Sequence, residues 1–219
     1  MQNIRDKKYI LFDLDGTLTD SYPAITTSFL YAISDYDVEL SEADLSSVIG
    51  PPLKDSFVRL LGVDPFEAWE LVLKYREFYN AGGMFNCKVY DGIVDMLKGL
   101  KDSGKVLSVA TSKPEEQAKL VLDHFGLTDY FEVIAGDDQK CSRHNKKLVI
   151  EYCLDRLGHH DREDVVMVGD RSYDMIGAKD AGVSAIGVTF GYGSTKELKD
   201  AGADYIVASA KELKELFVK

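Results

Sequence analysis

Short apolar runs alternate with amphipathic stretches along most of the chain. The segments between the later runs place apolar residues three and four positions apart, as in an amphipathic helix. Strands that are short, continuously apolar and separated by helices are typical of a parallel sheet buried on both faces. The pattern therefore predicts an α/β fold, with a Rossmann-like parallel sheet core and helices on both faces. The predicted strands are residues 10–12, 106–110, 131–135, 165–168, 185–188 and 205–207.

The stretch from about residue 19 to residue 86 differs, because every apolar repeat in it has helical spacing. Phe66, Trp69 and Leu73 recur in this way, and we expect them to face a core. An all-helical domain at 19–86 is therefore predicted to interrupt, directly after the first strand, a core domain made of 1–18 and 87–219. Its helices are predicted at Ile25 to Ile33, after a capping box formed by Ser41 and Asp44, at Leu53 to Leu61, and after Pro65.

Composition narrows the class of protein. The 219 residues suffice for one core with a smaller insertion, and a net charge of −11 disfavours a nucleic acid polymer as partner. Cys87, Cys141 and Cys153 lack the spacing of a zinc site or disulfide framework, which favours reduced thiols. No apolar run reaches the roughly 20 residues of a membrane span, and the first residues do not resemble a signal peptide. We expect a cytoplasmic protein, monomeric or homodimeric, without a membrane partner.

Two aspartates, Asp13 and Asp15, directly follow the first predicted strand, and Gly16 then allows a turn. In extended backbone the two carboxylates would project to the same side. Carboxylates that close repel each other unless a cation lies between them or one is protonated. The same residues are also common in surface turns, so the pair alone does not establish a site.

Other polar groups follow the later strands. Thr111 and Ser112 come after the run 106–110, where a hydroxyl and free helix amides could hold a phosphoryl oxygen, although both residues are also ordinary helix caps. Asp170 and Asp174 follow the run 165–168 and would face one cation if a helix begins there, although acidic residues also suit any helix N-terminus. Oxygen ligands of this kind favour Mg²⁺ over Zn²⁺, and ligands in such sheets bind at the carboxyl ends of strands.

The order of these motifs resembles that of the haloacid dehalogenase superfamily. Residues 13–17, Asp-Leu-Asp-Gly-Thr, are similar to its first motif, Thr111 and Ser112 to its second, and Gly-Asp-x-x-x-Asp at 169–174 to its fourth. The third motif is a lysine, for which Lys140, Lys146 and Lys147 compete; Lys146 is favoured because it stands at a helix entry. With a helical cap after the first strand, the chain most resembles the phosphoglycolate phosphatase-like branch.

The resemblance implies an Mg²⁺-dependent phosphatase that hydrolyses a small phosphate monoester through an aspartyl-phosphate. The ester would be phosphoglycolate-like or a 5′-nucleotide, and the partner therefore a small phosphorylated metabolite. Asp15 supports a phosphate ester, because dehalogenases that resemble this fold lack it. The implied site comprises catalytic Asp13 and Asp15, phosphate-binding Thr111, Ser112 and Lys146, and the metal ligands Asp13, Asp15, Asp170 and Asp174.

Three alternatives stay open at this stage. The chain could be a phosphotransferase of the β-phosphoglucomutase type, a pyrophosphatase of the same superfamily, or a non-catalytic protein on the same scaffold. Lys113 and Arg59 are weaker candidates for substrate contacts, and Tyr192 between two glycines is expected to mark a flexible loop.

Overall fold

The computed structural model describes residues 4–138, 142–159 and 161–218, and the chain divides into two compact units. The larger, Met1–Thr19 with Val89–Lys219, is named the sheet unit here, and the smaller, Asp20–Lys88, the helical unit. Within the described residues, no helix is both long and apolar enough to cross a membrane.

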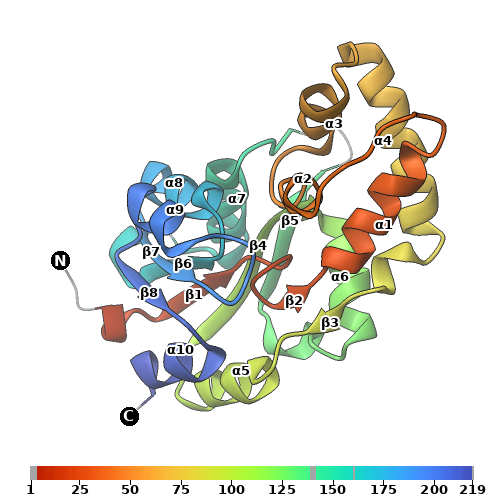
Figure 1. Cartoon of the computed structure of the whole chain (residues 1–219). Helices are drawn as coiled ribbons and strands as arrows, with labels where there is room; N and C mark the ends of the chain where they lie inside the picture. Colours follow the sequence, from red (N-terminus) through yellow and green to blue (C-terminus); the bar gives the residue numbers. More distant parts are fainter. Residues whose placement is uncertain (1–3, 139–141, 160, 219) are drawn as a thin grey trace. The chain divides into compact units, whose positions relative to one another are not determined.

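A six-stranded parallel sheet forms the centre of the sheet unit (Figure 1). Its order is β5-β4-β1-β6-β7-β8, so the first strand pairs with β4 on one side and β6 on the other. The predicted parallel sheet is confirmed. The strands are β1 (Tyr9–Phe12), β4 (Val106–Pro114), β5 (Val133–Asp137), β6 (Val165–Gly169), β7 (Ser184–Val188) and β8 (Tyr205–Val207).

Helices cover both faces of this sheet, as predicted (Figure 1). The first group, on one face, is α5 (Ile93–Asp102), α6 (Glu115–His124) and α10 (Ala210–Phe217). The second group, on the other face, is α7 (Lys146–Leu157), α8 (Ser172–Ala181) and α9 (Thr195–Asp200). Residues of β4, β5, β6 and β7 pack with the second group in one buried apolar cluster. Burial on both faces explains why the strands read as continuous apolar runs.

Strand β4 is longer than predicted. It continues to Pro114 instead of ending at Ala110, and its register against β5 shifts between these two residues. Thr111 and Ser112 therefore lie within the strand rather than after it. The following helix begins at Glu115.

The order in which strands are added to the sheet reverses at β1. The chain continues from β1 to β4 and β5 on one side, and then crosses to β6 on the other side. In open α/β sheets, ligands bind outside the carboxyl ends of the strands at such a reversal. Asp13 follows β1 and Asp170 follows β6, so the sheet topology places both residues there.

The helical unit contains α1 (Tyr22–Ala32), α2 (Glu42–Ser46), α3 (Leu53–Leu61) and α4 (Pro65–Asn80). The capping box is confirmed, because Asp44 N donates to Ser41 Oγ at 3.2 Å and Ser41 N donates to the Asp44 carboxylate at 3.0 Å. Gly62 follows the last residue of α3 and has the left-handed conformation that commonly ends a helix. The short strands β2 (Thr19–Asp20) and β3 (Lys88–Val89) pair with each other where the chain passes between the two units.

The face of α4 that is buried was predicted wrongly. Phe66 is 75% exposed and Trp69 is 39% exposed, and the Arg76 guanidinium lies 5.3 Å from the centre of the Trp69 ring. The helix carries a second and longer apolar stripe at spacings of three and four, and this stripe is the buried one. Its members are Ala68, Leu71, Val72, Tyr75 and Tyr79.

Replacing Phe57 by alanine should destabilise the helical unit by about 3–5 kcal/mol, because the ring is fully buried and stacks on Phe29 with centroids 4.4 Å apart. Phe66→Ala is the matched control, and the exposed ring should cost less than about 0.5 kcal/mol. Chemical denaturation of both variants measures the free energy of unfolding. Equal losses in the two variants would contradict the assignment of the core.

Candidate active site

The turn after β1 brings the first aspartate against β6. Asp13 N donates to Val168 O at 2.9 Å, which continues the pairing of β1 with β6 by one residue. Gly16 then has a φ of +88°, and a Cβ at this position would lie 2.3 Å from Oδ2 of Asp170. Only glycine fits such a turn, because the backbone must be left-handed and the neighbouring carboxylate leaves no room.

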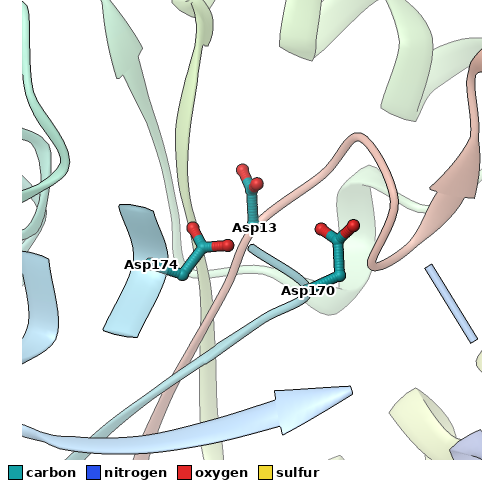
Figure 2. A group of neighbouring side chains, drawn as sticks. All are labelled: Asp13, Asp170 and Asp174. Atoms are coloured by element: carbon teal, nitrogen blue, oxygen red, sulfur yellow. The ribbon is translucent and has the colours of Figure 1, made fainter. Parts of the chain in front are cut away.

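Three carboxylates meet at the carboxyl ends of β1 and β6. Asp13 follows β1, Asp170 follows β6 and Asp174 stands in the first turn of α8; all three are buried. Their ligand oxygens lie within 4.8 Å of one another, and Figure 2 shows the three side chains side by side. This spacing suits a shared cation, because each carboxylate could give it one oxygen.

Lys146 is the lysine that the structure places among these carboxylates. Its Nζ lies 2.9 Å from Asp13 and 2.8 Å from Asp174, and it donates to Ala110 O at 3.1 Å. It is the first residue of α7, whose N-cap Asn145 accepts a hydrogen bond from Leu148 N at 3.0 Å. Lys147, in contrast, has a side chain that is 44% exposed and lies near Glu151 on the same helix. Lys140 falls outside the described residues.

Burial and charge shift the protonation equilibria of this cluster. Burial raises the pKa of Asp13 to about 6, although the neighbouring Lys146 opposes the shift. Burial also raises the pKa of Asp170 well above its usual range, and the Asp174 and Asp13 carboxylates add to this effect. Burial alone would lower the pKa of Lys146, but the two carboxylates beside it raise the pKa above its ordinary value. The lysine therefore stays charged, while burial shifts Asp13 and Asp170 toward their protonated forms.

Asp15 has a separate partner. Lys113 Nζ donates to both of its carboxylate oxygens, at 2.8 and 3.1 Å, and the Lys113 side chain is only 5% exposed. Thr111 is buried close by: its Oγ1 accepts from Lys113 N at 3.2 Å, and its hydroxyl lowers the pKa of Asp13. Ser112 is exposed on the same strand. Asp15 does not belong to the group of three carboxylates that share a potential metal position.

The charges of this region do not balance by themselves. Asp13, Asp15, Asp170 and Asp174 carry four negative charges when ionised, and the lysines paired with them carry two positive charges. Uncompensated charge is costly in a buried site. One divalent cation would offset the difference, and an all-oxygen ligand set suits a hard ion of this charge.

Further contacts hold Asp170, and the sequence analysis did not assign them to the site. Thr17 Oγ1 donates to its Oδ1 at 3.3 Å, and Tyr192 N donates to its Oδ2 at 2.8 Å. Tyr192 was expected to mark a flexible loop; instead, its backbone amide is part of the support of a site carboxylate. The glycines on both sides of Tyr192 were a usable signal, because they allow backbone to approach closely.

Because burial raises the pKa of Asp13, the free energy of unfolding of the metal-free protein should depend on pH. A carboxyl with a pKa of 3.8 when unfolded and about 6 when folded binds its proton more tightly in the folded state. The free energy of unfolding should therefore fall as pH rises through this window, by up to about 3 kcal/mol from Asp13. Urea denaturation in EDTA at several pH values measures it, with Asp13→Asn as control. The same pH slope in both proteins would contradict the prediction.

Comparisons with known proteins identify the family of the chain. Residues 10–188 match the haloacid dehalogenase-like hydrolase family. The chain is 38% identical over 208 residues to a protein named 5′-nucleotidase from Pseudomonas aeruginosa, covering 94% of each. It is also 38% identical to tyrosine-protein kinase PtkA of Mycobacterium tuberculosis, covering 94% of this chain and 70% of that protein.

Among solved structures, one described as a predicted phosphatase from Clostridium acetobutylicum superposes with a TM-score of 0.90 at 45% identity. The match covers 95% of this chain and 97% of that one. The family match spans most of the chain, including β1, β4, β6 and the residues that follow them. The chain belongs to the haloacid dehalogenase-like hydrolases and is a phosphatase of that family.

Proposed function

We propose that the protein is an Mg²⁺-dependent phosphatase that hydrolyses a small phosphate monoester through an aspartyl-phosphate on Asp13. The observation that carries this proposal is the position of Asp13. Its buried carboxylate is paired with Lys146 and lies within 4.8 Å of the carboxylates of Asp170 and Asp174. The surplus negative charge of this group calls for a divalent cation, and the nucleophile of the reaction is one of its members.

Asp13 is the proposed nucleophile. Its carboxylate is fixed by the backbone bond to β6 and by the Lys146 ammonium, so one oxygen can be directed at phosphorus. Asp13, Asp170 and Asp174 would hold Mg²⁺, which when bound supplies positive charge that keeps Asp13 ionised and stabilises the phosphoryl oxygens. Burial otherwise favours the protonated, non-nucleophilic form of Asp13.

Asp15 is the proposed general acid and base. It would donate a proton to the leaving alkoxide, and then take one from the water that hydrolyses the aspartyl-phosphate. The resemblance also counted Asp15 among the metal ligands. Its pairing with Lys113, outside the group of three carboxylates, distinguishes its side chain from the proposed metal ligands.

The phosphoryl oxygens need positive partners as charge develops on them. We assign this role to the Thr111 hydroxyl, the Ser112 amide and the Lys146 ammonium. Thr111 and Lys146 are both buried, Thr111 influences the pKa of Asp13, and Lys146 is paired with Asp13. An ammonium that stays charged at all physiological pH values is suited to this task.

The substrate class is a small phosphorylated metabolite. A 5′-nucleotide is the first candidate, because the Pseudomonas aeruginosa relative is named a 5′-nucleotidase. A phosphoglycolate-like ester is the second candidate, from the resemblance of the motifs. The helical unit, inserted after β1, is proposed to act as a cap that shapes the leaving-group pocket and excludes bulk water.

A second function is transfer of the phosphoryl group to an acceptor other than water. One relative is named tyrosine-protein kinase PtkA and matches 94% of this chain, and its name is the reason to test for phosphoryl transfer. An aspartyl-phosphate could be attacked by a hydroxyl as well as by water, and a mutase would use the same intermediate. Isomerised or transphosphorylated product would identify transfer, and phosphate release from pyrophosphate would identify a pyrophosphatase.

Asp13→Asn should abolish phosphatase activity, because the amide cannot act as the nucleophile. We expect kcat to fall by about 10⁴-fold or more. Phosphate release is measured with Mg²⁺ over 5′-nucleotides, phosphoglycolate, hexose phosphates and pyrophosphate, and again in EDTA. Asp123→Asn, which changes an exposed aspartate on α6, is the control and should keep wild-type activity. Full activity of Asp13→Asn would refute the mechanism.

Asp15→Asn should separate the two chemical steps. p-Nitrophenolate leaves without a proton, so this variant should release about one equivalent of p-nitrophenol rapidly and then turn over slowly. An alkyl phosphate needs the acid in the first step, so it should give no burst and a rate about 10²–10⁴-fold below wild type. Rapid-mixing absorbance and quench measurements follow both reactions. Equal loss of the first step with both substrates would argue against Asp15 as the acid.

A further inference from the structure

Glu197 lies on α9, far in sequence from the aspartates of the site, yet it contacts the segment between two of them. Its Oε1 accepts a hydrogen bond from Ser172 N at 2.9 Å and one from Arg171 Nε at 3.0 Å. Arg171 directly follows Asp170, and Ser172 is the first residue of α8. One carboxylate oxygen thus binds two consecutive residues that stand between Asp170 and Asp174.

These contacts bear directly on Asp174. Arg171 N donates to Asp174 Oδ2 at 3.1 Å, so the backbone at Arg171 sets the position of that carboxylate. Ser172 N is one of the helix amides that have no partner within α8. Glu197 provides this partner from another element and holds the first turn of the helix in place.

The start of α9 also supports Asp170. Tyr192 N donates to Asp170 Oδ2 at 2.8 Å, and a Cβ at Gly193 would lie 1.8 Å from Asp170 O. The loop backbone is therefore packed directly on Asp170. Ser194 is the N-cap of α9, and its Oγ accepts from Glu197 N at 3.1 Å. The segment from Tyr192 to Glu197 thus contacts Asp170 and the two residues that follow it, Arg171 and Ser172.

The environment of Glu197 suits a fixed ionised group. The side chains of Glu197 and Arg171 are 26% and 17% exposed, which is less than the surface pair Lys196–Asp200 on the same helix. Burial would raise the pKa of Glu197, but the Ser172 amide and the Arg171 guanidinium outweigh it and lower the pKa below its usual range. The carboxylate is therefore charged at neutral pH and accepts two hydrogen bonds.

We propose that Glu197 is a positioning residue for the metal centre: by fixing Arg171 and Ser172, its carboxylate keeps Asp170 and Asp174 at the spacing that one divalent ion requires. Glu197 itself touches neither the ion nor the substrate. This inference rests on the proposed function, because it requires Mg²⁺ at the three carboxylates. Groups that orient metal ligands typically affect metal affinity by about 10–100-fold.

The test measures Mg²⁺ binding to the whole purified protein by titration calorimetry, without substrate. Glu197→Ala removes both hydrogen bonds and should weaken Mg²⁺ binding by about 10-fold or more. Glu197→Gln keeps an oxygen that can accept from Ser172 N but loses the charge, so its affinity should be intermediate. Asp200→Asn, which removes an exposed carboxylate from the same helix, should bind Mg²⁺ as the wild type does.

Two further measurements separate positioning from general destabilisation. Activity titrated with Mg²⁺ should show a raised half-saturation concentration in Glu197→Ala, with kcat at saturating Mg²⁺ within a few-fold of wild type. The free energy of unfolding in EDTA reports any loss of fold stability. Should Glu197→Ala not fold, the nearly isosteric Glu197→Gln carries the same test.

Wild-type Mg²⁺ affinity in Glu197→Ala or, if it does not fold, in Glu197→Gln would overturn the inference, whatever the variant's stability in EDTA. The phosphatase proposal is judged separately, from the wild type alone. A wild type that binds Mg²⁺ but releases no phosphate from any ester would refute that proposal and leave the role of Glu197 standing. A wild type that binds no Mg²⁺ would refute both.

Discussion

The ion pairs of Lys146 are the interaction on which the site depends. A single buried ammonium lies within 3 Å of both Asp13 and Asp174, which come from opposite ends of the sequence. Because it also donates to the backbone of β4, it ties three elements together at one point. Removing one partner of a buried pair leaves an uncompensated charge, so loss of Lys146 alone would strongly disfavour this arrangement of carboxylates. The lysine therefore organises the site by holding these elements at one point.

The parallel sheet explains how so many charged groups come to lie together. The carboxyl ends of the parallel strands lie at the same edge of the sheet. The strand order reverses beside β1, and such a reversal leaves a crevice at this edge. Asp13 and Asp170 directly follow β1 and β6, whose register against each other is a property of the backbone, and Lys113 lies near the end of β4. The stability of the sheet thus supports a group of charges that would be unfavourable on their own.

Sequence patterns predicted the ends of β1 and β6 well, because the apolar run stops just before Asp13 in the first and just before Gly169 and Asp170 in the second. Choosing Lys146 needed the resemblance as well, since Lys147 has equal charge and adjoins it. The contacts that no pattern revealed depend on tertiary structure: Lys113 reaches Asp15 across 98 residues, and Tyr192 acts through a backbone amide that every residue but proline possesses. In α4, two apolar stripes competed, and only packing decides which stripe is buried.

The strands β2 and β3, which pair with each other, are the two connections through which the chain enters and leaves the helical unit. The chain leaves the sheet unit at Thr19 and returns at Val89, and these two connections lie beside each other. An inserted domain whose ends adjoin can be lengthened, shortened or exchanged as one cassette without disturbing its host. Selection can therefore remodel the accessory segment in evolution while the registers that align Asp13 with Asp170 are inherited unchanged.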